Sequence, residues 1–140
     1  MLLFGKNQNQ KYQTALLIFL FLHVGLILEL VLVGHYDSFW QFFPLISLML
    51  GLVSLTIQSR LVILVKFFYS ITILSGVLGV FLHLKSNWEF ELEMYAEIAT
   101  DELIVRSLSG ALPALPPGIL IPVGLMGFHL LQLKSKDKLK

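Results

Sequence analysis

Long runs of apolar residues, separated by short polar connections, dominate the pattern along this chain of 140 residues. Each run supplies most or all of the about 20 residues that an α-helix needs to cross a hydrocarbon core of about 30 Å. The pattern therefore predicts an all-α membrane protein, a bundle of four transmembrane helices. The expected spans are residues 14–33, 40–57, 61–84 and 112–133.

The connection between the third and fourth spans, residues 85–111, is too long for a simple turn. Apolar and acidic residues alternate over 88–93, which taken alone favours a strand. We prefer a helix, because Ser86 and Glu89 match a helix-capping pair, glutamate disfavours strands, and a lone strand has no partner. A second short helix, capped by Thr100, is expected to follow. The sequence thus predicts a partly helical loop between helices 3 and 4.

The composition indicates that lipid is the main solvent. Apolar residues make up 56% of the chain and charged residues 14%, against about 45–50% and about 25% in soluble domains. Four spans leave no room for a second core, so we predict one integral membrane domain, residues 1–140, in contact with the lipid bilayer. No phosphate loop, nucleotide fingerprint or nucleic-acid module is present, and we expect no nucleic-acid partner.

The charged residues are separated by sign. The cations on one side of the expected spans, accompanied by Asp137, are Lys6, Lys11, Arg60, Lys134, Lys136, Lys138 and Lys140. The carboxylates on the other side, accompanied by Lys85 and Arg106, are Asp37, Glu89, Glu91, Glu93, Glu97, Asp101 and Glu102. Because cytoplasmic flanks carry the excess of Lys and Arg, we predict a plasma (inner) membrane protein with cytoplasmic N- and C-termini and an extracytoplasmic acidic loop. Termini on one side require an even number of crossings, which agrees with four.

Short connections and small residues predict which helices touch. The turn at residues 58–60 is so short that the second and third spans must be antiparallel neighbours. Small residues, which let membrane helices approach closely, recur at helical spacing in three spans. They are Ser47, Gly51 and Ser54, then Thr72, Gly76 and Gly79, and finally Gly124 and Gly127. The stripe on the third span continues to His83, which is therefore expected to face the bundle.

One carboxylate and one lysine lie inside the expected spans, where a central charge costs about 2.5–3.5 kcal/mol on insertion scales. Glu29 either faces the bundle in a functional role or reaches interfacial water, because it is close to the end of its span at Gly34. We expect Lys66 to extend its ammonium group to the cytoplasmic boundary. A direct pair between the two is not expected, because their depths differ by roughly 15 Å.

The four histidines fall at three depths. His35 and His83 lie at outer span ends, His23 near mid-membrane and His129 near the cytoplasmic end. His23 has no second histidine at its depth, so a bis-histidine haem has no ligand pair there. For His23 and His129 we expect interhelical hydrogen bonds to a hydroxyl or a carbonyl group. Cysteine is absent, which excludes disulfides and thiolate-bound clusters.

The outer level contains the strongest candidates for a site. Its candidate metal ligands are His35, Asp37, His83 and Glu29. Histidine with carboxylate suits a divalent cation such as zinc, manganese or iron, proton or quinone chemistry, or a purely structural hydrogen-bond cluster. No metal-hydrolase motif is present, and the sequence identifies no cofactor. The candidate binding residues are Glu29, His83, Trp88 and Glu89.

No catalytic constellation is visible, so we do not expect an enzyme. The favoured hypothesis is a non-catalytic subunit or scaffold of a larger membrane assembly, with other membrane subunits or further copies of the chain as partners. Its helical loop would be the docking surface, and Glu29 and His83 would hold a polar contact. The alternative is an oligomeric transporter or channel for a cation or proton that uses Glu29 and the outer histidines. An intramembrane enzyme or redox subunit ranks last.

Overall fold

The computed structural model describes residues 2–95, 97–110 and 115–138, and the side chains of 9–95, 97–110 and 115–135. The described part is helical apart from its connections. The elements are α1 (Leu2–Leu32), α2 (Phe39–Ile57), α3 (Val62–Met94), α4 (Thr100–Ser109), the 3-10 turn η1 (Pro116–Ile119) and α5 (Leu120–Lys138). The predicted all-α architecture is confirmed.

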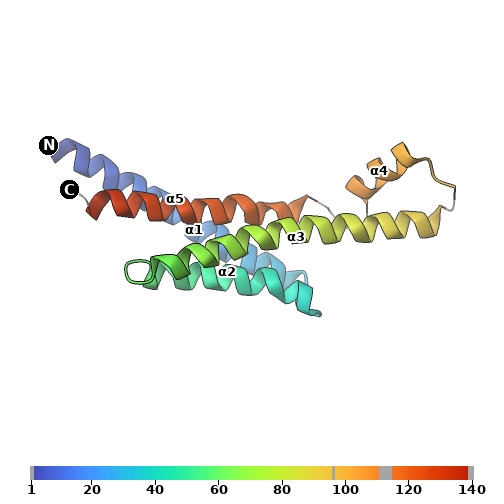
Figure 1. The fold of residues 1–140 in the computed structure, drawn as a ribbon, viewed down its shortest axis with the longest axis horizontal. Helices are drawn as coiled ribbons and strands as arrows, with labels where there is room; N and C mark the ends of the chain where they lie inside the picture. The colour runs from blue at the N-terminus through green and yellow to red at the C-terminus, as the bar shows by residue number, and fades with distance from the viewer. Residues whose placement is uncertain (1, 96, 111–114, 139–140) are drawn as a thin grey trace.

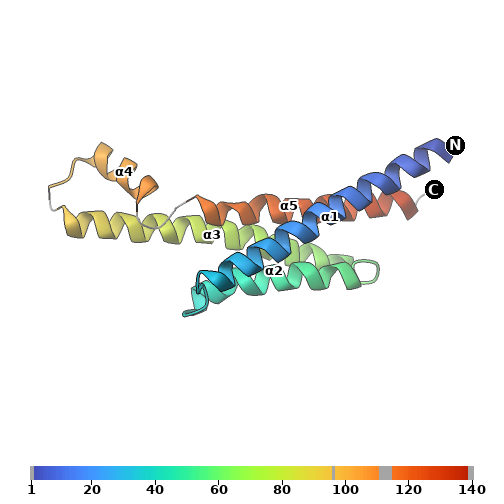
Figure 2. The same cartoon turned by 180° about the vertical axis from the view of Figure 1, so that it is seen from behind.

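Four long helices form the bundle, and a fifth lies outside it. α1, α2, α3 and α5 run alongside one another, with α1 crossing obliquely, while α3 continues far beyond the others (Figures 1 and 2). α4 folds back over this extension of α3 (Figure 1). The start of α1, the end of α5 and the α2–α3 turn lie at one end of the molecule. The extension and α4 lie at the other.

Each of the four long helices is long and apolar enough to cross a membrane. The candidate spans are Asn9–Leu32, Phe39–Ile57, Val62–Met94 and Pro116–Ser135. Large apolar side chains cover the outside of the bundle, and two of the most exposed are Ile63 at 86% and Leu32 at 84%. Such a surface suits contact with lipid tails rather than with water. The protein is therefore a small four-helix membrane protein.

The preference for a helix over a strand at residues 88–93 is confirmed, but the predicted separate start at Ser86 is wrong. α3 runs without interruption from Val62 to Met94. No proline or glycine follows Gly79 within it, so no residue breaks the helix. The short helix near Thr100 is present as α4. In the last span, residues 111–114 lie outside the described part, and the regular helix α5 begins at Leu120 after η1.

The small residues lie where neighbouring helices touch, as predicted. Ser47, Gly51 and Ser54 are buried in α2. In α5, a Cβ on Gly124 would lie 2.6 Å from the Cγ1 atom of Ile73, and one on Gly127 would collide with the ring of Tyr69. α5 can approach α3 this closely only because these positions have no side chain. Close packing of this kind replaces the hydrophobic drive that lipid does not supply.

Buried polar side chains link the helices between these contacts. The hydroxyl groups of Ser54 in α2 and Tyr69 in α3 lie 2.7 Å apart, and Thr72 Oγ1 donates to the carbonyl of Ser47 at 3.3 Å. The expected antiparallel α2–α3 hairpin is confirmed by these bonds and by the short turn after Ile57. In an apolar surrounding each bond satisfies groups that would be costly to bury alone.

Candidate functional site

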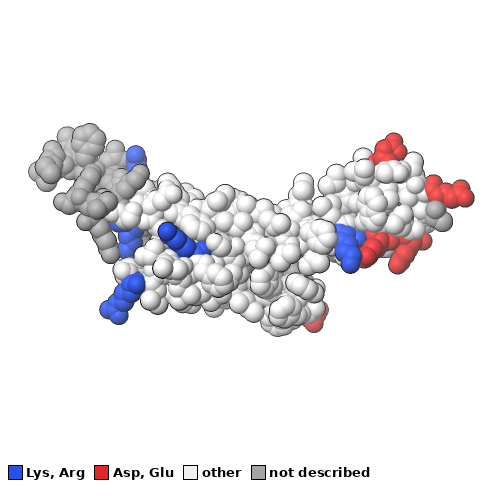
Figure 3. Space-filling view, in the orientation of Figure 1, with Lys and Arg blue, Asp and Glu red and all other residues white. Residues whose placement is uncertain are grey.

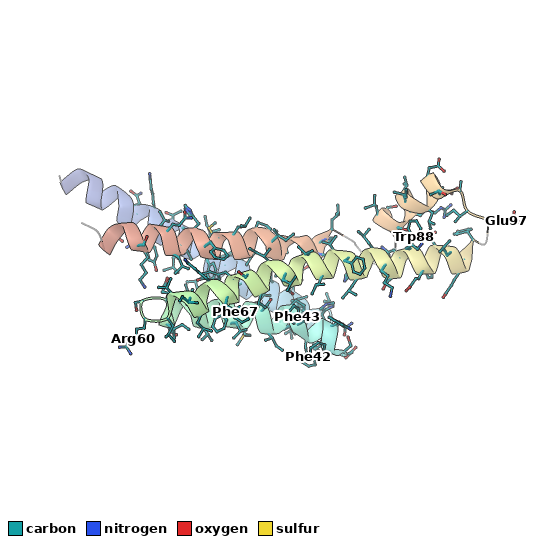
Figure 4. All side chains as sticks on the ribbon, viewed as in Figure 1. Phe42, Phe43, Arg60, Phe67, Trp88 and Glu97 are labelled. Carbon is teal, nitrogen blue, oxygen red and sulfur yellow. The ribbon has the colours of Figure 1, made fainter. Side chains whose placement is uncertain are left out.

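The end of α3 and the whole of α4 form a compact unit, which we call the acidic head and define as residues 85–95 and 97–110. Acidic side chains gather over it, whereas most basic side chains lie at the opposite end of the molecule (Figure 3). Trp88 and Glu97 lie in this unit and Arg60 lies at the basic end (Figure 4). The predicted separation of charge along the chain is thus a separation in space.

Arg106 of α4 connects the two helices of the acidic head. Its Nη2 atom lies 2.7 Å from Glu102 Oε1, and its Nη1 atom lies 3.7 Å from Glu91 Oε2 on α3. The guanidinium group also lies 4.5 Å from the centre of the Tyr95 ring. Hydrogen bonds, first with Glu102 and then with Tyr95, raise the pKa of Arg106. The nearly buried Glu91 carboxylate therefore has a lasting positive charge beside it.

A hydrogen bond from Asn87 fixes α4 on α3. The side-chain Nδ2 of this buried residue donates to the carbonyl of Ser107 at 2.9 Å. A Cβ on Gly110 would lie 2.8 Å from the Asn87 amide carbon, so α4 ends against that amide because glycine is there. The two helices thus form a defined unit and not a flexible loop.

The surface of the acidic head combines carboxylates with exposed large apolar side chains. The exposed apolar residues are Trp88, Phe90, Leu92, Met94, Tyr95, Ile104, Val105 and Leu108. Exposed carboxylates stand among them on both helices, at Glu89, Glu93, Glu97, Asp101 and Glu102. A lipid-facing surface excludes this many charges, and a water-facing one rarely presents this many apolar groups together. The acidic head therefore carries a mixed surface, with large apolar side chains set among carboxylates.

Two of the predicted outer residues come together below the acidic head. The ring centroids of His35 and His83 lie 6.4 Å apart. Gly34, with a φ of 70°, ends α1 and allows His35 N–H to bond to the Leu30 carbonyl at 2.8 Å, which turns His35 back over the bundle. Partial burial, and secondly the charge of His83, lower the pKa of His35. The pair joins the end of α1 to α3.

The other two candidate metal ligands are placed differently. Glu29 is exposed on α1, and the Asp37 side chain is exposed in the α1–α2 turn. The Asp37 N–H donates to Gln41 Oε1 at 2.7 Å, a contact that orders the start of α2. Within the part of the chain that the structure describes, no group of three or more His, Asp or Glu residues could hold a metal ion. The structure therefore joins His35 with His83 but not the four predicted ligands.

The remaining predicted residues fall in three places. Trp88 and Glu89 belong to the acidic head, where Glu89 Oε1 lies 3.6 Å from Lys85 Nζ. Lys66 is exposed near the basic end of α3, and its extension toward the membrane boundary stays a prediction. His23 is 1% exposed, and its Nδ1 contacts the Phe19 carbonyl of its own helix at 2.8 Å. The partner is a carbonyl group, as expected. The hydrogen bond lies within α1, however, so the prediction that it would join two helices is wrong for this bond.

Sequence reasoning missed the residues that hold the acidic head together. Arg106 and Asn87 carry no motif, and Arg106 entered only as one of two cations among many carboxylates. That rarity was the available signal, because a cation in a segment rich in carboxylates is a natural partner for several of them. The contact with Glu91 could not be inferred, since it requires α4 to fold back onto α3.

By its fold this chain belongs to the broad class of small four-helix membrane proteins, here with a short additional helix, α4, packed on the extension of α3. No protein-family model matches it, and neither a curated protein nor a solved structure does.

Proposed function

We propose that this protein is a non-catalytic subunit or scaffold of a larger membrane assembly, and that the acidic head is its docking surface. One observation carries the proposal: the acidic head is a fixed helical pair whose outer surface presents apolar side chains among carboxylates. Val105 is 63% exposed and Met94 59% exposed, although both lie in a unit held by buried polar contacts. Exposed apolar groups on an ordered surface favour a protein partner.

The charge of the acidic head specifies what this partner should look like. Carboxylates outnumber the cations Lys85 and Arg106 there, and both cations already contact carboxylates within the acidic head. A complementary surface would offer apolar side chains ringed by Lys or Arg. Another membrane subunit with such a surface, or a basic region of a second copy, satisfies this chemistry.

Extraction of the full chain from its membrane in mild detergent tests the proposal. Wild-type protein should migrate as one complex of defined mass, and mass spectrometry would distinguish another subunit from a second copy. The paired substitution Met94→Ala and Val105→Ala should release the monomer, since it removes apolar contact area. Leu17→Ala with Leu32→Ala is the matched control on the exposed face of α1. A wild-type monomer, or a complex unchanged by the Met94 and Val105 substitutions, would contradict the proposal.

The second candidate is an oligomeric transporter or channel for a cation or proton. The exposed position of Glu29 favours it, because an ionisable group on a lipid-facing helix is costly unless another chain or water covers it. The nearby Gly25 leaves open space on the same helix for such a neighbour. Flux of protons or cations into liposomes, present for wild type and lost in Glu29→Gln with helicity unchanged, would promote this candidate above the first.

A further inference from the structure

His23 lies in the contact between α1 and α2, where its ring is almost fully enclosed. The residue is 1% exposed, and a Cβ on Gly51 of α2 would collide with its Nε2 atom. The ring also stacks on Phe19 of its own helix, with ring centroids 3.8 Å apart. The Nε2 edge of the imidazole therefore packs directly on the backbone of α2, and glycine at position 51 is what permits this contact.

The hydrogen bond within α1 determines which nitrogen of the ring carries a proton. Nδ1 lies 2.8 Å from the Phe19 carbonyl oxygen, and because a carbonyl only accepts, Nδ1 is protonated. Nε2 is buried and has no hydrogen-bond partner among the described residues. In the neutral ring Nε2 is an acceptor without a donor, whereas in the charged ring it would be a cationic donor without an acceptor. The charged ring is much the costlier of the two to bury, so this contact holds the neutral ring.

The helices around His23 offer little to offset a positive charge on it. α1 packs on α2 and α5, and α3 approaches through Tyr69, whose ring centroid lies 5.8 Å from that of Phe19. α2 contains no Asp, Glu, Lys, Arg, His or Tyr. The ionisable side chains described on the other packed elements are Lys11, Tyr12 and Glu29 of α1, Tyr69 of α3, and His129 and Lys134 of α5. Glu29, the one carboxylate in this described set, is exposed, so none of these side chains is an acid buried with the ring.

We propose that His23 is a proton-binding latch between α1 and α2. The neutral ring lets α1 close on α2 at Gly51, and a proton on Nε2 separates the two helices until this N–H reaches a water molecule. α1 stays in the bundle while it moves, because Ala15 and Phe19 pack in a second cluster with Leu130 of α5. This inference is independent of the docking surface on the acidic head.

Proton linkage gives the direction and the size of the response. The open form binds a proton that the closed form excludes, so a falling pH favours opening. An imidazole in water titrates near pH 6.5, and the ratio of open to closed protein should therefore rise by about thirtyfold between about pH 8 and about pH 5. Most carboxylates stay ionised over this interval, so they contribute little to the change.

Distances between spin labels in the full chain test the proposal. The chain has no cysteine, so introduced cysteines can be labelled at chosen sites only. Leu17→Cys with Val53→Cys reports on α1 and α2, and Phe67→Cys with Leu125→Cys reports on α3 and α5; all four positions are exposed. Pulsed electron paramagnetic resonance in phosphatidylcholine vesicles should show a longer α1–α2 distance that gains population at pH 5. The α3–α5 distance should not change.

Two histidine variants show whether His23 is the cause. His23→Phe keeps an aromatic ring that binds no proton, so it should abolish the response. His129→Gln is the matched control, because it removes an exposed histidine from another span, and it should leave the response unchanged. If circular dichroism shows that His23→Phe does not fold, His23→Gln, which also binds no proton, replaces it.

Nitrogen NMR of the wild-type His23 ring supplies a test that needs no substitution of this residue. Nε2 should become protonated only under conditions in which the longer α1–α2 distance is populated. A protonated ring with an unchanged distance would overturn the proposal, because the closed contact would then accommodate the charge. An α1–α2 distance that is the same at pH 8 and pH 5, or a response that persists in the non-titratable variant, would overturn it as well.

Discussion

The bundle and the acidic head are both built from packed helices, yet different forces hold them. In the bundle, glycines and hydroxyl-bearing residues allow α5 and α2 to lie close to α3. In the acidic head, α4 is held on α3 by ion pairs of Arg106 and an amide hydrogen bond of Asn87. Lipid offers no hydrophobic drive for helix association, so close packing of complementary surfaces holds the helices of the bundle together. In the acidic head, polar contacts fix the position of α4 on α3.

The largest expected effect comes from a substitution that introduces a steric clash between two helices of the bundle. Gly127→Leu should lower the free energy of unfolding by about 3 kcal/mol, because the new side chain meets the buried ring of Tyr69. Reversible unfolding in mixed detergent, followed by circular dichroism, measures this. Gly25→Leu is the matched control, since nothing lies within 4 Å of a Cβ at that position. Similar losses for the two variants would mean that close packing at Tyr69 is not the cause.

The next effect should be confined to the acidic head. Asn87→Ala removes the donor to Ser107 and should cost about 1–2 kcal/mol locally, because the carbonyl it leaves is buried. Amide hydrogen exchange should rise across α4 while the bundle amides stay protected. Ser86→Ala, at the exposed neighbouring position, should leave the exchange of α4 unchanged. Faster exchange throughout the bundle would show that the two regions are not separable.

A smaller effect is expected from the charges of the acidic head. Arg106→Gln should destabilise α4 less than Asn87→Ala does, mainly because Glu91 loses its nearby cation while remaining largely buried. Adding Glu91→Gln should restore part of the loss, since the uncompensated charge is then gone. The hydrogen-exchange rates of α4 in the single and double variants form the comparison. A double variant that is less stable than Arg106→Gln would refute this explanation.

The smallest effect concerns the contact between His35 and His83, which joins the end of α1 to α3 below the acidic head. His35 has a pKa below the ordinary 6.5, mainly through burial and secondly through His83, so His83→Gln should raise that pKa without restoring the ordinary value. Because the folded pKa is lowered, the unfolded chain binds more protons, and stability should fall as the pH drops below about 6.5. Proton-detected titration of the His35 ring measures the shift. An unchanged pKa in His83→Gln would remove the proposed coupling.

The sequence allowed the bundle to be predicted more fully than the acidic head. Apolar length indicates each span, and Gly124 and Gly127 mark their contacts, because these properties are local to each helix. The capping pattern at Ser86 led to a wrong prediction of a helix start. The helix α3 instead continues through this position, where the side-chain amide of Asn87 is hydrogen-bonded to α4. The rotation of α1 could not be inferred, since it is apolar around its circumference, and so Glu29 could not be placed. The sequence placed His35 and His83 at one depth, and their ring centroids lie 6.4 Å apart.

The continuity of α3 has a mechanical consequence. At about 1.5 Å per residue, its 33 residues measure about 50 Å, whereas a bilayer core is about 30 Å thick. One uninterrupted rod is therefore packed into the bundle along part of its length and carries α4 along the rest. It sets how far α4 stands from the bundle, and a tilt imposed at one end of α3 is passed to the other, because no hinge interrupts the helix.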